Sequence, residues 1–387
     1  MPTELQTRHR VFQGDARRMA AVADASVHLV VTSPPYPMIA MWDGVFSRQD
    51  AQIAPALAGG RPREGFERMH ALLDPVWKEI HRVLLPGGFA CINIGDAVRS
   101  FNGEFGLYAN HVRILAYLQR IGFTCLPVIL WHKPTNAPTK FMGSGMLPAG
   151  AYVTLEHEYI LVVRKGGKRR FSPEEQQRRR ASAIFWEERN IFYSDIWTDI
   201  RGAGQTLEGE EPRARSAAFP FELALRLILM YAIKGDTVLD PFWGTGTTTL
   251  AAAAAGRSSI GCEIEPQLAR FGARFDAAVL GAMQAHLRAR LERHASFVRE
   301  REALKGPLKY CNRHYGFGVT TRQEQALFID RPCRFAPRSP KDLVVAYDDA
   351  FLYGFPSVDR NERPTLDAKA VTVPPSTLPA PLQLKLF

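Results

Sequence analysis

Short apolar runs alternate with amphipathic stretches along most of this chain. Runs with the length and composition of buried strands occupy residues 27–31, 89–94, 123–131, 159–163, 236–239 and 258–262. Stretches with apolar residues at a helical spacing lie between them, at residues 64–85, 105–121, 221–232 and 247–255. This alternation predicts an α/β fold with a mostly parallel sheet and helices on both of its faces.

Three segments depart from the alternation. Residues 37–65 are rich in Gly, Ala and Pro, a composition that favours a mobile loop. Residues 164–180 carry eight basic residues against two acidic ones, and they open a polar segment that reaches residue 216. From residue 284 an Arg-rich helical stretch leads into irregular sequence and a proline-rich tail.

Composition narrows the class of protein. A chain of 387 residues with 46% hydrophobic content suffices for one large α/β domain with an extra lobe, or for two modest domains. The five cysteines are scattered, with no Cys-x-x-Cys pair or histidine at metal spacing, so we expect a reducing cytoplasm and no metal. No apolar run has the length of a membrane span. The net charge of +10 favours an anionic partner, because basic side chains release counterions from phosphate backbones.

A nine-residue segment, Asp-Pro-Phe-Trp-Gly-Thr-Gly-Thr-Thr at residues 240–248, follows one of the predicted strands. Its glycines, Gly244 and Gly246, allow a tight turn, and a helix begins at the threonines, so backbone amides face a ligand. Glu263 stands nineteen residues after Gly244, at the end of the next strand, where an acid accepts hydrogen bonds from ribose hydroxyls. No Lys follows Gly246, so the loop is not a Walker A phosphate loop.

A second short segment, Thr-Ser-Pro-Pro-Tyr at residues 32–36, ends the predicted strand 27–31. Taken alone, a Ser-Pro-Pro-Tyr sequence is more typical of a rigid turn or a polyproline ligand. Its position directly after a buried strand favours a functional site, since parallel strands end at the same edge of a sheet.

Together the two segments resemble motif IV, the catalytic S-P-P-Y, and motif I, the cofactor loop, of the S-adenosylmethionine-dependent DNA amino-methyltransferases. The catalytic motif precedes the cofactor motif, an order that resembles the circularly permuted beta class of that family. The resemblance covers about residues 12–267 and implies a Rossmann-like methyltransferase fold with a mostly parallel, seven-stranded sheet. It also implies S-adenosyl-L-methionine as the cofactor.

The resemblance assigns a set of cofactor-binding residues. Those near the methionine end are Thr32, Asp240, Pro241, Phe242, Gly244, Thr245, Gly246, Thr247 and Thr248, while Glu263 holds the ribose. Asp15 matches the family's G-D element near the adenine, although an Asp there could instead cap a helix. Phe219 and Pro220 match motif X, with a hydrophobic staple at a helix start as the alternative.

The catalytic residues implied by motif IV are Ser33, Pro34, Pro35 and Tyr36. An exocyclic amino group is a weak nucleophile because its lone pair is delocalised into the base. Acceptors from Ser33 and from the Pro34 carbonyl would localise that lone pair, and Tyr36 would stack on a base flipped out of the duplex. Within the family, S-P-P-Y favours N4 of cytosine, and N6 of adenine is the alternative. Carbon-5 methylation needs a cysteine, and we interpret the remote Pro332-Cys333 pair as structural.

The resemblance places target recognition between the two motifs. We therefore divide the chain into residues 1–164, the catalytic half, 165–215, the recognition insert, 216–283, the cofactor half, and 284–387, an extension that could bind DNA. Basic residues expected on DNA are Lys165, Lys168, Arg169, Arg170 and Arg201, although a solvated charged loop is the ordinary interpretation of such a run. His157, in a His-Glu-Tyr-Ile segment resembling motif VIII, could line the base pocket or be structural.

The expected partner is double-stranded DNA. A restriction endonuclease acting on the same site is a further possible partner, and the chain would act as a monomer or a homodimer. We expect a cytoplasmic, nucleoid-associated protein of a bacterium or archaeon. An N-methyltransferase acting on RNA or protein is a more distant alternative.

Overall fold

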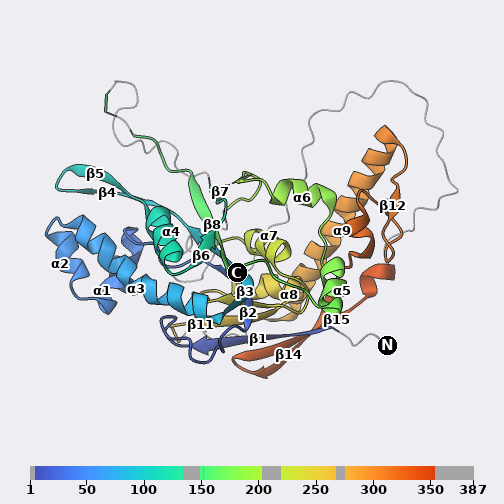
Figure 1. The fold of residues 1–387 in the computed structure, drawn as a ribbon, viewed down its shortest axis with the longest axis horizontal. Helices are drawn as coiled ribbons and strands as arrows, with labels where there is room; N and C mark the ends of the chain where they lie inside the picture. The colour runs from blue at the N-terminus through green and yellow to red at the C-terminus, as the bar shows by residue number, and fades with distance from the viewer. Residues whose placement is uncertain (1–4, 134–148, 151, 203–218, 267–274, 354–387) are drawn as a thin grey trace.

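A computed structural model describes residues 5–133, 149–150, 152–202, 219–266 and 275–353. They form one mixed sheet of eleven strands with helices on both faces (Figure 1). Five neighbouring strands at its centre are parallel, in the order β1 (Gln6–Gln13), β11 (Ser258–Glu263), β10 (Thr237–Asp240), β2 (Val27–Thr32) and β3 (Leu84–Ile94). The predicted α/β class is therefore confirmed.

The two motif-bearing strands are neighbours although some two hundred residues separate them. Val238 and Leu239 of β10 pair in parallel with Leu29 and Val30 of β2. Both strands therefore end at the same edge of the sheet, which we call the carboxyl edge; the opposite edge, where β2 and β10 begin, is the amino edge.

Antiparallel strands extend the sheet beyond β3. Strand β8 (His157–Lys165) pairs with β3, and β6 (Phe123–Cys125) and β7 (Ile129–His132) pair with β8. The short β9 (Ile196–Trp197) completes this side beside β7. The single strand predicted at residues 123–131 is thus two strands.

The expected count of seven strands is wrong, in part because the C-terminal region contributes a hairpin. Strands β14 (Arg331–Ser339) and β15 (Asp342–Asp348) pair with each other, and β15 pairs antiparallel with β1. Leu343 and Val345 of β15 are fully buried. The segment predicted to be irregular therefore belongs to the main sheet. The prediction missed β14 because its prolines and arginines obscure the pattern of a strand.

Helices cover the two faces of the sheet with separate apolar clusters. Helices α7 (Phe221–Tyr231), α8 (Thr247–Ala254) and α9 (Ala277–Lys305) pack on the face that carries Leu29 and Val31. Helices α3 (Pro62–Val83) and α4 (Asn110–Arg120) pack on the face that carries Val30. The alternation of β2 side chains between the two faces explains why the strand is apolar throughout.

The predicted mobile loop at residues 37–65 is wrong. This segment forms η1 (Ala40–Trp42), α1 (Asp43–Gln49) and α2 (Ile53–Ala58), and then enters α3. Phe46 and Ile53 are almost fully buried with α3, so tertiary packing stabilises helices that the Gly, Ala and Pro content obscures.

Smaller elements complete the fold. The helix expected from residue 105 begins later because β4 (Ala97–Phe101) and β5 (Glu104–Tyr108) form a hairpin ahead of it. The polar insert holds α5 (Pro173–Ala181), which begins with a capping box at Ser172, and α6 (Trp186–Phe192). After α9 come β12 (Tyr310–Cys311), β13 (Gly318–Val319) and η4 (Arg322–Ala326), with η5 (Ala350–Tyr353) after β15. No helix among the described residues combines the length and apolar character needed to cross a membrane.

Candidate active site

Asp240 joins the two motifs at the carboxyl edge. The Thr32 hydroxyl donates to Asp240 Oδ1 at 2.7 Å, and the Thr248 hydroxyl donates to Oδ2, also at 2.7 Å. The Phe242 amide donates to Oδ1 at 3.1 Å. Burial raises the pKa of Asp240 to about 6, although these three donors oppose the rise. The carboxylate therefore ties the end of β2 to the loop and to the start of α8.

The Gly-rich loop turns sharply and reaches the next strand end. Gly244 and Gly246 both adopt positive φ angles, 52° and 86°. The Gly244 amide donates to Glu263 Oε2 at 2.7 Å, and the Glu265 amide donates to Oε1 at 2.9 Å. Of the other predicted loop residues, Phe242, Thr245 and Thr247 are half-buried, while Pro241, Gly246 and Thr248 are buried.

Trp243, which sequence analysis did not single out, shapes the underside of this loop. The ring is 2% exposed, and its Nε1 donates to Thr249 Oγ1 at 2.9 Å. A Cβ added to Gly261 would lie 2.2 Å from the Trp243 ring, and one added to Gly246 would lie 2.7 Å from it. The second loop glycine thus serves packing as well as turning. A tryptophan directly before the first loop glycine, Gly244, was the available signal.

Gly14 and Asp15 lie beside Glu263. The Gly14 amide donates to the Glu263 carbonyl at 2.8 Å. Asp15 does not cap a helix: its carboxylate accepts from the Arg17 amide at 2.8 Å and forms an ion pair with the Arg17 guanidinium. The helix-cap alternative is therefore wrong, and contact with adenine stays a prediction.

The space beside this loop is open at two glycines. A Cβ added to Gly14 would meet no atom within 4 Å, and one added to Gly244 would meet only the Phe242 carbonyl, at 3.8 Å. Glu263 and the first turn of α8 border the same space, so an acid and backbone amides are available to ribose and carboxylate groups. Phe219 and Pro220, at the start of α7, are buried, and their ligand contact stays a prediction.

Motif IV is part of a polar network built from four strands. Ser33 Oγ donates to the Tyr36 hydroxyl at 3.0 Å, and that hydroxyl donates to Glu158 Oε2 at 2.8 Å. Asn93 Nδ2 donates to both, at 2.8 Å to Tyr36 and 2.6 Å to Glu158. Lys133 Nζ donates to Glu158 Oε1 at 2.8 Å. Burial, together with the Glu158 carboxylate, raises the pKa of Tyr36, so the phenol remains protonated.

Glu158, Asn93 and Lys133 are the site residues that sequence reasoning missed. Glu158 is the second residue of the His-Glu-Tyr-Ile segment, and it comes beside motif IV because β8 pairs antiparallel with the end of β3. A single carboxylate in a strand gives no signal until that register is known. His157 lies at the start of β8, edge-on to Tyr159 with ring centroids 4.9 Å apart.

Pro34 is buried and Pro35 half-buried, so the motif IV backbone has little freedom. The Tyr36 ring packs on Gly95, where an added Cβ would lie 3.0 Å from Tyr36 Cε2. Gly95 thus admits the ring at the end of β3. Stacking of Tyr36 on a base stays a prediction.

The structure does not bring the basic run to this edge. Lys165 Nζ donates to the Leu84 carbonyl at 2.7 Å, and Leu84 pairs with Val27, which is about 16 Å from Thr32 along β2. Arg169 forms ion pairs with Asp236 at 2.7 Å and Glu175 at 2.8 Å.

The remaining basic residues are exposed. Lys168 and Arg170 flank Arg169 near the amino edge. Arg201 lies near the carboxyl edge, next to Gly202, whose added Cβ would meet Lys133 Cε at 3.5 Å. DNA contact by these residues stays a prediction. It concerns the amino edge for Lys168 and Arg170 and the carboxyl edge for Arg201.

Comparisons with known proteins agree with this geometry. A family model described as DNA methylase, covering N6 and N4 enzymes, matches residues 27–274. The type II methyltransferase M.MthZI of Methanothermobacter thermautotrophicus is 47% identical over 331 residues, which are 85% of this chain and 92% of that protein. The type II methyltransferase M.MjaI of Methanocaldococcus jannaschii is 50% identical over 279 residues, which are 69% and 91% of the two chains.

A solved structure is similar as well. TTHA0409 of Thermus thermophilus, described as a putative DNA modification methylase and crystallised with S-adenosyl-L-methionine, is 38% identical with a TM-score of 0.52, over 68% of this chain and 91% of that one. The chain belongs to the N6/N4 family of DNA methylases. The predicted methyltransferase class and its S-adenosyl-L-methionine cofactor are confirmed at this level. Among the described residues, no cluster of three His, Cys, Asp or Glu side chains could hold a metal ion.

Proposed function

We propose that this protein is a site-specific, type II DNA methyltransferase that methylates N4 of cytosine in double-stranded DNA. The observation that carries the proposal is the direction of the Ser33 hydrogen bond: Ser33 donates to Tyr36 and so presents its oxygen as an acceptor. The names of the archaeal relatives, both type II methyltransferases, support the class. The order of the motifs, with Ser33 before the cofactor loop, supports the circularly permuted architecture.

Glu158 determines which way the network points. An ionised carboxylate paired with Lys133 accepts hydrogen bonds and donates none, so the Tyr36 hydroxyl donates to it. The Tyr36 oxygen then accepts from Ser33, which turns the Ser33 hydrogen away from the open side of the site. A serine oxygen has two lone pairs, and both remain available to a substrate.

That polarity suits an exocyclic amino group. One N–H of the flipped base would donate to Ser33 Oγ and the other to the Pro34 carbonyl, which draws the nitrogen toward tetrahedral geometry. The lone pair is then directed at the cofactor side of the carboxyl edge. When S-adenosyl-L-methionine is bound by the Asp240 to Thr248 loop and Glu263, it supplies the methyl group as an electrophile.

Cytosine N4 is favoured because Ser33 is neutral and stands where adenine enzymes of the family mostly carry an acid or an amide. Adenine N6 remains the alternative within the same chemistry. The experiment is incubation with DNA and isotope-labelled S-adenosylmethionine, followed by digestion to nucleosides and mass spectrometry. N4-methylcytosine is expected. N6-methyladenine would select the alternative, and label in RNA or protein but not in DNA would overturn both.

For recognition, we propose that Arg201, the exposed residue of the insert that lies near the carboxyl edge, contacts the duplex around the target base. The division at residues 164, 215 and 283 is part of the proposal, as are a cognate restriction endonuclease, a monomeric or homodimeric state and a cytoplasmic, nucleoid-associated location. Sequencing that detects modified bases in a host expressing the chain would give the base and its sequence context together. Modified bases scattered without a common sequence would contradict site specificity.

A further inference from the structure

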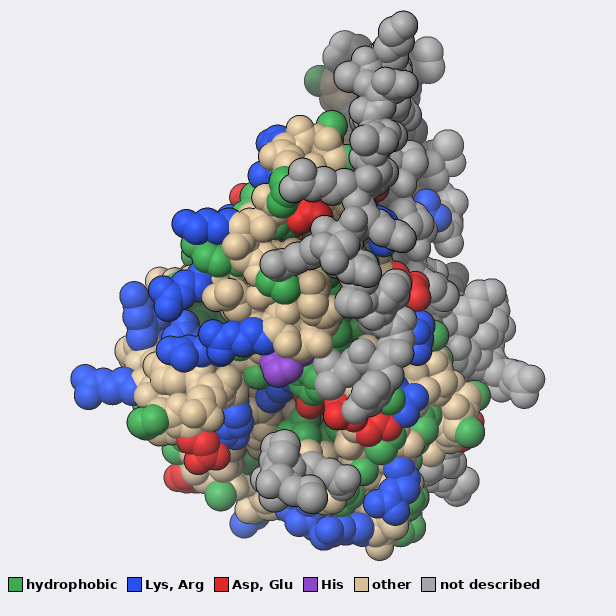
Figure 2. Space-filling view, turned by 90° about the vertical axis from the view of Figure 1, so that its right-hand side faces the viewer, with side chains coloured by type: hydrophobic (Ala, Val, Ile, Leu, Met, Phe, Trp, Pro, Cys, Tyr) green, Lys and Arg blue, Asp and Glu red, His purple; other side chains and the backbone are tan. Residues whose placement is uncertain are grey.

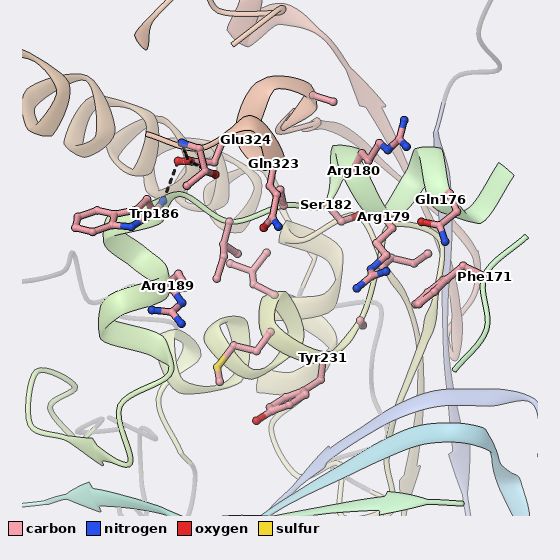
Figure 3. A pocket seen from close by; sticks show the side chains of 18 of the residues that line it. Phe171, Gln176, Arg179, Arg180, Ser182, Trp186, Arg189, Tyr231, Gln323 and Glu324 are labelled. Carbon is pink, nitrogen blue, oxygen red and sulfur yellow. Dashed lines mark hydrogen bonds between the residues drawn. The ribbon is translucent and has the colours of Figure 1, made fainter. Parts of the chain in front are cut away.

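A large hollow lies near the amino edge of the sheet, on the opposite side from Ser33. Its volume is about 1580 Å³, and its walls are α5, α6 and η4, with the C-terminal end of α7 beneath (Figure 3). We call it the amino-edge groove. Its lining includes six exposed basic side chains: Lys168, Arg179, Arg180, Arg189, Arg313 and Arg322.

These six charges are not neutralised by the described part of the protein. No ion pair joins any of them to a carboxylate among the described residues. The acidic residue among the described lining is Glu324, which is 1% exposed and accepts hydrogen bonds from the Trp186 amide at 2.8 Å and the Thr321 amide at 2.7 Å. Its carboxylate is therefore committed to local structure.

The charges come from separate segments that meet across the hollow. Lys168, Arg179, Arg180 and Arg189 belong to the polar insert, and Arg313 and Arg322 belong to the extension after α9. Arg179 and Arg189 reach the groove from opposite sides (Figure 3), and Lys and Arg side chains gather on the face of the molecule that carries α5 and α9 (Figure 2). Like charges that face one another across a hollow repel, so an anion bound between them would be stabilised.

The size and chemistry of the groove indicate the anion. Small-molecule pockets are typically about 300–1,000 Å³, so this groove suits part of a macromolecule. Five of the six cations are arginines, whose planar forks bind phosphate through paired hydrogen bonds. A chain of phosphates spaced along a backbone would satisfy several of them at once.

We propose that the amino-edge groove binds the phosphate backbone of duplex DNA outside the segment being methylated. The inference rests on the proposed function, because it takes DNA as the polyanion that the protein meets. The groove and the catalytic motif lie on opposite edges of one sheet, so a short duplex at Ser33 leaves the groove open to a flanking or second segment. The groove then retains the enzyme on long DNA without reading sequence.

The test uses Arg313→Gln/Arg322→Gln, a double variant outside the recognition insert. Its affinity for a 60-base-pair duplex without the target site is expected to fall about 10-fold or more at roughly 0.1 M salt. The dependence of log K on log salt should also become less steep, by up to about 2, because each lost phosphate contact reduces the slope by about 0.9. Turnover on a target duplex of about 15 base pairs should stay unchanged. Arg334→Gln/Arg338→Gln removes two exposed arginines from β14 of the same extension and should change neither quantity.

Arg313→Lys/Arg322→Lys keeps both positive charges and should keep most of the affinity. This variant therefore distinguishes loss of charge from loss of folding as the cause of weaker binding. Wild-type binding of the long duplex by the Gln variant would overturn the inference. Equal loss of short-duplex turnover and long-duplex binding would also overturn it, because the groove would then belong to the catalytic cleft. Wild-type protein that binds the long duplex through the groove but methylates no DNA would refute the proposed function and leave the groove standing.

Discussion

The polar groups at the two edges of the sheet differ in whether other groups of the protein already bind them. At the carboxyl edge, Ser33, Tyr36 and Glu158 satisfy one another, and Asp240 is held by three donors. At the amino edge, six exposed cations face a hollow without carboxylate partners among the described residues. The first arrangement positions atoms before a substrate arrives, whereas the second leaves charge for a partner to neutralise. Catalysis requires groups that are positioned in advance, whereas binding of a DNA backbone requires only available positive charge.

The strongest test of the comparison is Ser33→Ala. We expect turnover to fall about 10²- to 10³-fold, the range typical for removing one hydrogen-bonding group that acts on the transition state. S-adenosylmethionine affinity, measured by calorimetry, should change less than about 3-fold. Ser26→Ala is the control, because it removes a hydroxyl whose hydrogen bond among the described residues is to the Ala23 carbonyl. Equal losses of turnover and cofactor binding would show that Ser33 is not the catalytic group.

Asp240 predicts a pH dependence of stability. Its folded pKa, about 6, lies above the ordinary 3.8, so its contribution is fully present below about pH 3.8 and is lost as pH rises toward 6. A rise of the pKa from 3.8 to about 6 corresponds to at most about 3 kcal/mol of stability. Denaturant unfolding of Asp240→Asn from pH 4 to 7 should lack this fall. An unchanged pH profile in the variant would assign the titration elsewhere.

Glu158→Gln tests whether the network sets the polarity of Ser33. A glutamine amide donates as well as accepts, so the Tyr36 hydroxyl is no longer forced to donate to position 158, and the Ser33 lone pairs are no longer fixed. We expect turnover to fall about 10-fold, or 1.4 kcal/mol, with cofactor affinity retained. Glu156→Gln, on an exposed acid two residues earlier, should be silent. Full activity of Glu158→Gln would remove the network from the mechanism.

The smallest expected effect belongs to the amino edge. Arg180→Ala should change the free energy of unfolding by no more than about 0.5 kcal/mol, because no described carboxylate pairs with that guanidinium. Arg169→Ala, which breaks ion pairs to Asp236 and Glu175, should cost more in the same denaturant experiment. If the two variants cost the same, the division between structural and free cations is wrong.

Local pattern and motif were enough to predict part of this molecule. The strands that end at Thr32 and Asp240 and the glycine loop follow from short segments. Long-range pairing was not accessible. The β14–β15 hairpin, the position of Glu158 beside Tyr36, and the convergence of Arg189 with Arg322 each depend on register or packing between distant segments.

The pairing of β1 with β15 also has a consequence for how the chain is made. Gln6 lies opposite Ala346, so one side of the first strand is covered only after 340 further residues exist. At about 5–20 residues per second, the ribosome takes roughly 20–70 s to supply them. During that interval the outer hydrogen-bonding groups of β1 have no strand partner, and such an exposed strand edge is prone to pair with other chains. Because β15 is the last of the described strands to be made, this edge of β1 is closed only when the chain is nearly complete.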